Sequence, residues 1–315
     1  MRVYRSLAEV PAGLGGSAVA IGKFDGMHNG HRAVIAGLRA QATARGLRAV
    51  VVTFDRHPLS LLRPESCPES LLSNDQKLEL LESIGVDETL MLTFDRALSD
   101  LEPEVFVQAI LVGALHAELV LVGADFRFGA KNAGTVQLLE ELGSSHGFEV
   151  EMIRDVAPDG EHRVSSTRIR ELLAEGRVAE AAVLLGSLPT IRSVVVHGEQ
   201  RGRALGYPTA NLSPHLEGFV PADGVYAAWL SVDGQRYPAA VSIGNNPTFD
   251  GVPEKQVEAH ALDQNLDLYD RTVEVSFVEF VRGMRKFDGV DALAAQMHAD
   301  EQRIRVILGL PPRSA

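Results

Sequence analysis

The sequence predicts an α/β domain with a parallel sheet, followed by an all-β domain that forms a small antiparallel barrel with a terminal helix. Two observations carry this prediction. In the first half, short apolar runs alternate with segments of helical spacing, whereas the second half consists of short runs separated by turn signals. A chain of 315 residues is long enough for about two domains, each with its own core. We place the domains at residues 1–186 and 187–315.

The first half contains four near-continuous apolar runs, at 18–22, 48–54, 89–94 and 118–123. Such runs are typical of strands that are buried on both faces of a parallel sheet. Helical spacing of apolar residues lies between them, at 33–44, 75–84 and 103–115. Ligands of parallel sheets bind beyond the carboxyl ends of the strands. Three polar segments follow predicted strands and therefore fall there: "GKFDGMHNGH", "DRHP" and "GADFRFG".

The second half changes its period after residue 190. The runs "RSVVVHGE", "GVYAAWLSVDGQRYPAAVSIG", "QVEAHALD" and "RTVEVSFVEFV" are separated by turns such as "DGQ" and "NNPT". This pattern predicts an antiparallel sheet or small barrel. Residues 290–308 have apolar side chains at helical spacing, so we expect a helix that packs against it. The domain boundary lies where a helix ends at Gly186 and Pro189 prevents its continuation.

Composition and charge restrict the partners. The formal net charge of −12 argues against binding of duplex nucleic acid, but it leaves room for an anionic small molecule in a locally positive pocket. The single cysteine, Cys67, cannot form an internal disulfide. The N-terminus lacks the order of a signal peptide, and the long apolar stretch 109–126 is too mixed to span a membrane. We therefore expect a cytoplasmic protein with neither a nucleic-acid nor a membrane partner, and a weak homo-oligomer is left open.

The segment "GKFDGMHNGH" places two histidines, His28 and His31, at a strand-to-helix junction. A metal site would need further ligands, for which no motif is evident. An anion site fits better, because Gly26 and Gly30 let the backbone approach a ligand and the helix start supplies N–H groups. A plain structural turn is the third alternative. Asp25 could assist a metal, but we slightly favour a structural role in which it accepts backbone N–H groups.

A second anion signal is the segment "RVSSTRIRELL" at 163–173. A serine or threonine of residues 165–167 caps a helix whose first turn carries Arg168 and Arg170. Cations oppose the helix dipole at this end, typically by a few tenths of a kcal/mol to about 1 kcal/mol each. Pairing of Arg168 with Glu171 would compensate for this. A bound polyphosphate would make the same charges favourable, and two helix starts suited to anions favour that interpretation.

Taken together, "GKFDGMHNGH", "TFDRHP", "LVLVGADFRFG" and "VSSTRIR" resemble the adenylyltransferase module of bacterial bifunctional riboflavin kinase/FAD synthetases. That module is a Rossmann-like nucleotidylyltransferase with an HxGH signature. The resemblance implies that the FMN phosphate attacks the α-phosphorus of ATP and expels pyrophosphate. It implies that His28 and His31 act on the ATP phosphates and that Phe126 and Phe128 lie near the flavin. The nucleotide contacts that it further implies are Gly22, Phe24, Gly30, Asp125, Arg163, Ser166, Thr167 and Arg168.

The second half carries its own candidate site residues. In "GRALGYPTANL", Thr209 and Asn211 present oxygen atoms on one side of an extended segment, which suits Mg²⁺, although an ordinary turn would look the same. In "VEAHALD", strand alternation puts Glu258 and His260 on one face. A kinase that acts on an alcohol needs a proton acceptor, whereas a solvent-facing strand would carry such residues without any function.

These segments, with "GVYAAW", "YPAAVSIGNNPTF" and "LDLYD", resemble the riboflavin kinase module in the family order. The two resemblances cover residues from about 15 to 305. They imply a riboflavin-kinase-like barrel in which Glu258 is the base and Thr209 and Asn211 hold Mg²⁺. They also imply nucleotide contacts at Gly202, Gly206 and Pro208, and a flavin contact at Arg282. The implied substrates and products are ATP, riboflavin, FMN and FAD.

The chain departs from the family pattern at a few positions: Ser187, Leu188, Pro189, Asp270 and Met284. They bear on flavin affinity and on the contact between modules. The leading hypothesis is a bifunctional enzyme that makes FMN from riboflavin and then FAD from FMN. The alternatives are an enzyme with only one of these activities, or a non-catalytic regulator that binds flavin or nucleotide. We also expect the stretch 55–70, which carries three prolines, to be mobile without ligand.

Overall fold

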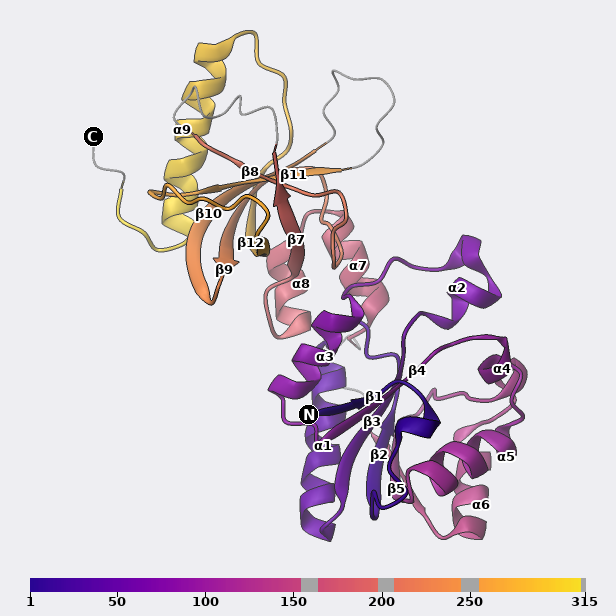
Figure 1. Ribbon diagram of the computed structural model, residues 1–315. Helices are drawn as coiled ribbons and strands as arrows, with labels where there is room; N and C mark the ends of the chain where they lie inside the picture. Colours follow the sequence, from indigo (N-terminus) through magenta and orange to yellow (C-terminus); the bar gives the residue numbers. More distant parts are fainter. Residues whose placement is uncertain (154–163, 198–206, 245–254, 313–315) are drawn as a thin grey trace. The chain divides into compact units, whose positions relative to one another are not determined.

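The computed structural model describes residues 1–153, 164–197, 207–244 and 255–312. The chain forms two compact units, Met1–Ser165 and Ser166–Ala315. The first unit is an α/β layer structure and the second is a barrel with helices (Figure 1). Within the described residues, no helix combines the length and hydrophobicity that a membrane crossing requires.

The first unit is built on a six-stranded sheet in the order β1-β4-β3-β2-β5-β6. Every neighbouring pair is parallel. The strands are β1 (Arg2–Tyr4), β2 (Ser17–Ile21), β3 (Arg48–Phe54), β4 (Glu88–Leu92), β5 (Ala117–Gly123) and β6 (Glu149–Ile153). The four predicted strands are confirmed as β2 to β5. The edge strands β1 and β6 were not predicted, because β1 is only three residues long and β6 alternates Glu with apolar residues.

Helices cover both faces of this sheet (Figure 1). One face packs against α1 (Asn29–Arg45) and α3 (Asn74–Ser83) through Ile35, Leu38 and Leu81. The other face packs against η3 (Val107–Ala114) and α6 (Val136–His146). The remaining helices of the unit are η1 (Leu7–Glu9), α2 (Pro58–Leu62), η2 (Pro64–Ser66), α4 (Arg96–Ser99), α5 (Pro103–Phe106) and η4 (Ala130–Asn132). The sheet is therefore buried on both sides, as its apolar strands require.

Two helical predictions need correction. The predicted helix 33–44 begins earlier, at Asn29, so His31 lies in its first turn. The predicted helix 103–115 is one turn of α-helix that continues as the π-helical segment η3. The stretch 55–70 forms two short helices, α2 and η2, because His57 caps the first and a proline starts each. Its mobility without ligand remains a prediction.

The strand order brings two of the predicted site segments together. The chain runs from β2 to β3 and β4 on one side, and then returns to place β5 on the other side of β2. The order reverses at this point, and ligands of α/β sheets bind in the crevice outside the carboxyl ends there. "GKFDGMHNGH" follows β2 and "GADF" follows β5, so both lie at the carboxyl ends of these two neighbouring strands.

The second unit contains a closed barrel in the order β10-β11-β8-β7-β12-β9, which confirms the predicted antiparallel barrel. Its strands are β7 (Thr190–Val196), β8 (Ala210–Leu212), β9 (Gly224–Val232), β10 (Gln235–Gly244), β11 (Gln256–Ala261) and β12 (Thr272–Arg282). The predicted terminal helix is confirmed as α9 (Val290–Ile307), and Ile304 packs into a core cluster with Val225 and Val281. Two helices, α7 (Ser166–Ala174) and α8 (Val178–Leu185), precede the barrel. Gly186 ends α8 in left-handed backbone, as expected.

Candidate active sites

The turn after β2 is held in an unusual backbone conformation by buried side chains. Phe24 and Met27 both have positive φ, at 49° and 45°, and both side chains are almost fully buried. Non-glycine residues adopt this conformation at a cost, so the packing of the two side chains must fix it. Gly26, with φ of 83°, completes the turn. Buried side chains of the core therefore hold this turn.

The two histidines stack on each other at the start of α1. Their ring centroids lie 3.7 Å apart with an interplanar angle of 16°, and Phe24 meets His31 edge-on. His28 is the N-cap residue, and its Nδ1 accepts a hydrogen bond from the His31 amide at 3.4 Å. When neutral, the ring therefore carries its proton on Nε2, which makes Nε2 a donor. This arrangement places an imidazole N–H donor at a helix N-terminus, where anions bind.

Close packing explains two of the predicted nucleotide-binding glycines. A Cβ atom on Gly30 would lie 3.1 Å from Cε1 of His28, and one on Gly22 would lie 3.1 Å from Cε2 of Phe24. Larger residues at either position would push these rings aside. The two glycines thus allow the rings to take their places, whether or not they contact a nucleotide.

Asp25 links this turn to another part of the chain. Its Oδ1 accepts a hydrogen bond from the backbone N–H of Leu71 at 2.8 Å. This contact supports the structural role that we favoured for Asp25. Leu71 lies shortly before α3, so the carboxylate joins the turn after β2 to the segment that leads into that helix.

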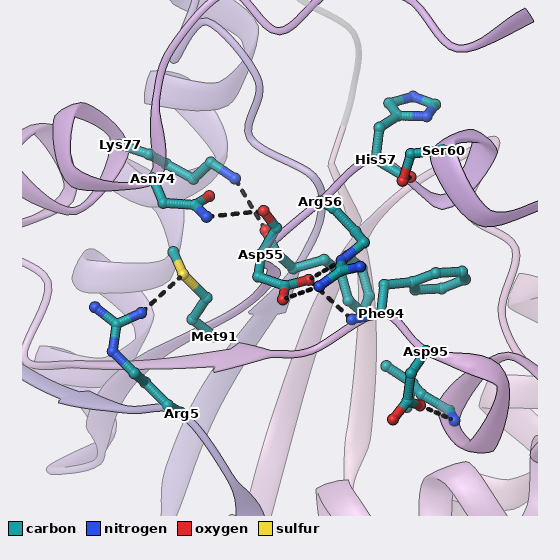
Figure 2. Close-up of polar contacts among 12 residues, drawn as sticks. Arg5, Asp55, Arg56, His57, Ser60, Asn74, Lys77, Met91, Phe94 and Asp95 are labelled. Carbon is teal, nitrogen blue, oxygen red and sulfur yellow. Dashed lines mark hydrogen bonds and ion pairs between the residues drawn. The ribbon is translucent and has the colours of Figure 1, made fainter. Parts of the chain in front are cut away.

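A polar cluster surrounds the carboxyl end of β3 (Figure 2). The carboxylate of Asp55 accepts hydrogen bonds from the Phe94 amide and from Arg56. Partial burial by itself raises the pKa of Asp55, but the hydrogen bonds from Arg56 and Phe94 and the charge of Arg56 bring it below its usual value. Beyond it, Nε2 of His57 lies 3.2 Å from Nζ of Lys23, which belongs to the turn after β2.

The segment after β5 holds the three residues predicted from "GADFRFG". Asp125 is exposed close to the end of the strand. Phe126 and Phe128 stack with centroids 5.6 Å apart, and Phe128 is only 5% exposed because it packs against Phe106 in the core. Phe128 therefore has a packing role, and Phe126 is the more accessible of the two rings.

The "SSTRIR" segment forms the beginning of α7, in the second unit. Arg168 pairs with Glu171 at 3.0 Å, so the charge of Arg168 at this helix start is compensated within the helix itself. Both side chains are about half exposed, and such pairs contribute little to stability. Residues 166–168 belong to a different unit from the two histidines. That both groups bind the same nucleotide remains a prediction.

Glu258 and Asn211 are direct cross-strand neighbours on β11 and β8, and Ser242 of β10 lies on the other side of Glu258. Val257 and Ala259, which flank Glu258 on β11, point into the barrel and are almost fully buried. Glu258, Asn211 and Ser242 therefore share the outer face of the barrel. Thr209 lies two residues before Asn211 and so on the same face of the extended segment.

Thr209 also lines a cavity of about 360 Å³, together with Pro208, Tyr269 and buried residues of β7, β8 and β11. His260, the second residue of "VEAHALD" on the outer face, donates from Nδ1 to the carbonyl oxygen of Pro208 at 2.7 Å. Its ring also meets Tyr207 edge-on. The imidazole thereby fixes the backbone directly before Thr209.

Comparison with known proteins identifies the family. Two family models match the chain, FAD synthetase over residues 11–168 and riboflavin kinase over residues 185–308. A protein of Escherichia coli (strain K12) with the name "Bifunctional riboflavin kinase/FMN adenylyltransferase" is 36% identical over 311 residues, which cover 98% of each chain. The protein of the same name from Listeria monocytogenes is 37% identical over 290 residues, or 91% of each chain.

The chain belongs to the bifunctional riboflavin kinase/FMN adenylyltransferase family. It carries both the FAD synthetase and the riboflavin kinase domain, as the sequence predicted. A solved structure named "Crystal Structure of Macrolide-efflux Protein from Streptococcus pneumoniae" is also similar. Its TM-score is 0.87 at 34% identity, and the match covers 96% of this chain and 98% of that one.

Within this bifunctional family member, Arg282 has a structural partner. Its guanidinium pairs with the buried carboxylate of Asp300 on α9, with Nη2 at 2.7 Å from Oδ2. Nε donates to the same carboxylate. Arg282 thus holds α9 against the end of β12, and its predicted contact with the flavin remains a prediction. The neighbouring Met284 lies against Gly244 and Ser242.

Three predicted site residues, Arg163, Gly202 and Gly206, lie outside the described residues. Conversely, sequence reasoning missed Lys77 and Asn74 of α3. Lys77 is only 7% exposed and lies one turn before the buried Leu81. A lysine on the apolar face of a predicted helix is a detectable signal, because lysine is rarely buried without a specific partner.

Proposed function

We propose that the second unit transfers the terminal phosphate of ATP to the primary hydroxyl of riboflavin, giving FMN and ADP. The first unit then transfers AMP from a second ATP to FMN, giving FAD and pyrophosphate. The observation that carries the kinase half is the cross-strand pair of Glu258 and Asn211 with Thr209 close by. This arrangement supplies a proton acceptor and two oxygen donors on one face of the barrel.

In the kinase reaction, the carboxylate of Glu258 accepts the proton of the riboflavin hydroxyl while that oxygen attacks the terminal phosphorus. Thr209 and Asn211 would hold Mg²⁺, which prefers a few oxygen ligands from protein and takes the rest from phosphates and water. When bound, the ion neutralises charge on the phosphates. The cavity beside Thr209 is large enough to admit part of the nucleotide.

In the adenylyl transfer, a phosphate oxygen of FMN attacks the α-phosphorus of ATP and pyrophosphate leaves. Such transfers need little covalent help, so alignment and charge stabilisation dominate. His28 and His31 would donate to the phosphates at the start of α1, where the helix N–H groups add to them. Ser166, Thr167, Arg168 and Arg163 would contact the nucleotide, and Phe126 the flavin.

The test incubates the purified protein with ATP and Mg²⁺, and with either riboflavin or FMN as the flavin. The expected products are FMN and then FAD from riboflavin, and FAD alone from FMN. Chelation of divalent cations with EDTA is expected to stop the phosphorylation. If FMN accumulates and no FAD forms, the protein has only the kinase activity. If FAD forms from added FMN but riboflavin is not phosphorylated, the protein has only the adenylyltransferase activity. No turnover, despite calorimetric binding of ATP and flavin, would favour the non-catalytic regulator.

We further propose that the protein acts in the cytoplasm. With a single cysteine the chain forms no internal disulfide, so its fold does not depend on an oxidising compartment. Fractionation of the native cells with a marker enzyme tests this proposal. Sedimentation over a range of protein concentrations tests for a weak homo-oligomer.

A further inference from the structure

The first turn of α3 is built to be rigid. Ser73 is its N-cap residue and forms a capping box with Gln76, in which each side chain bonds to the other's backbone N–H. Capping of this kind typically contributes about 1 kcal/mol to helix stability. Asn74 and Lys77 extend from this turn, and both reach the carboxyl end of β3 (Figure 2).

These two side chains bind consecutive carbonyl groups. Nζ of Lys77 donates to the carbonyl oxygen of Phe54 at 3.1 Å, and Nδ2 of Asn74 donates to that of Asp55 at 2.8 Å. Phe54 is the last residue of β3, and Asp55 is the first residue of the segment that leads to His57. The path of the chain as it leaves the strand is therefore set by α3.

The same part of the chain also holds the turn after β2. Leu71, just before α3, donates to the carboxylate of Asp25 in that turn. Thr53 of β3 donates from Oγ1 to the carbonyl oxygen of Lys23 at 3.2 Å. The segments after β2 and β3 are thus joined to α3 and the residues just before it, and Thr53 at the end of β3 also bonds directly to the segment after β2. They carry His28 and His57, respectively, at the edge of the sheet where we place the adenylyl transfer.

The charge of Lys77 matters at this edge. Burial lowers the pKa of Lys77, whereas the carboxylates of Asp25 and Asp55 act in the opposite direction and favour its charged form. An aliphatic side chain would fill the same place at lower desolvation cost. Without the ammonium group, Asp25 and Asp55 would lose one nearby cation, and Arg56 would remain as the partner of Asp55. The buried lysine thus offsets negative charge at the edge of the sheet where an anionic substrate has to bind.

We propose that Lys77 and Asn74 are positioning residues for the adenylyl transfer: they fix the segment that carries His57 against the turn that carries His28. The inference rests on the proposed position of that reaction at the carboxyl ends of β2, β3 and β5. Neither residue needs to touch the substrate. Lys77 acts through Phe54 and through the charge of the two aspartates, and Asn74 acts through Asp55.

The experiment compares Lys77→Met and Asn74→Ala with matched controls in the full-length protein. Methionine keeps the length and apolar stem of lysine but removes the charge and the donor. Lys131→Met makes the same change at an exposed lysine of the same unit, and Asp75→Ala makes a truncation at an exposed neighbour of Asn74. FAD formation from FMN and FMN formation from riboflavin are measured for each variant at a temperature well below unfolding.

We expect Lys77→Met to lower kcat/KM for FAD formation about a hundredfold, and Asn74→Ala about tenfold, because small misplacements at an aligned site have effects of this size. The KM for ATP should rise more with Lys77→Met than with Asn74→Ala, since only the first changes the charge. The rate of riboflavin phosphorylation should stay within about twofold of wild type in Lys77→Met and Asn74→Ala. In the two control variants, the rates of FMN and FAD formation should both stay within that range.

The proposal is overturned if Lys77→Met and Asn74→Ala shift the melting temperature but leave kcat and KM of FAD formation at wild-type values. It is also overturned if both reactions fall together with the loss of folded protein in Asn74→Ala, because the effect would then be structural. His28→Asn provides the separate test of the site itself. If His28→Asn retains full FAD formation, the proposed position of the reaction is wrong, whatever the outcome for Lys77.

Discussion

Glu258 of β11 lies directly opposite Asn211 of β8, so the candidate base and a candidate metal ligand are fixed by one pair of hydrogen-bonded strands. Side chains on directly opposed residues are about 4.5–5.5 Å apart at their Cβ atoms. This distance suits a site in which a hydroxyl oxygen approaches Glu258 while the phosphate is held on the Asn211 side.

The first prediction concerns that pair. Glu258→Gln keeps the size of the side chain but removes the proton acceptor, so kcat for riboflavin phosphorylation should fall about 10²- to 10⁴-fold. FAD formation from added FMN should not change, because that reaction belongs to the other unit. Both rates can be followed by chromatography of the flavins. A variant that retains near wild-type kcat with riboflavin would remove Glu258 from the mechanism.

The second prediction separates the two nitrogen atoms of His260. Nδ1 donates to the carbonyl of Pro208, next to Thr209. Asparagine can place a donor near the position of Nδ1, whereas glutamine places one near Nε2. If the ring acts by fixing Pro208, His260→Asn should keep most of the kinase activity, and His260→Gln should raise the Mg²⁺ concentration needed for half-maximal rate by about tenfold. The opposite ranking of the two variants would contradict this role.

The third prediction concerns the stacked histidines. His28→Asn keeps a good N-cap acceptor for α1, whereas His28→Ala removes it at a cost of about 1 kcal/mol. Both variants lose the imidazole donor, so kcat/KM for FAD formation should fall at least about tenfold in each. Only the alanine variant should also unfold at a lower temperature. Circular dichroism melts together with the flavin assay distinguish the cap from the chemistry.

The fourth prediction tests whether Arg282 is structural. Arg282→Met leaves the buried carboxylate of Asp300 without its partner guanidinium, so the barrel should lose about 2 kcal/mol of unfolding free energy. This is less than for a fully buried pair, because the side chain of Arg282 is 20% exposed. Asp300→Asn should have a smaller effect. If instead Arg282→Met raises the KM for riboflavin while the melting temperature stays constant, the residue contacts the flavin.

The fifth prediction follows from the lowered pKa of Lys77, whose usual value is 10.5. Between the lowered folded pKa and the unfolded pKa, the unfolded state binds more protons than the folded state, so stability from this group rises with pH. Lys77→Met lacks this dependence. The stability of wild type relative to Lys77→Met should therefore increase as the pH rises through the lowered pKa toward the usual value of 10.5 in denaturant titrations. A constant difference over this range would mean that folding does not shift the titration of this lysine.

The central strands and the barrel could be predicted because their residues follow simple periods. β2 to β5 consist largely of apolar residues, and the barrel strands are bounded by turns that sequence reveals. The edge strand β6 could not be predicted, since three of its five residues are glutamate or exposed methionine. Its strand conformation comes from pairing with β5 rather than from its own pattern.

The candidate sites were predicted less evenly. Motif positions identified Glu258, Asn211 and the two histidines, because each lies in a short segment with a recognisable spacing. The contacts of Lys77 with Phe54 and of His260 with Pro208 join residues that are 23 and 52 positions apart. The periodicity of a short segment cannot predict contacts over such distances in the sequence. The structural partner of Arg282 was missed for the same reason, since Asp300 lies 18 residues away on another element.

The barrel is closed by its shortest strand. β8 has only three residues, and it joins β7 and β11 through two residue pairs on each side. Asn211 is the middle residue of this strand, and Thr209 immediately precedes the strand. A nucleotide and metal ion that bind at Thr209 and Asn211, as we propose, would therefore also stabilise the pairing of β8 with β7 and β11. Amide protons of β7 and β11 should exchange with deuterium more slowly once nucleotide is present, so that isotope uptake at this seam reports occupancy without any assay of turnover.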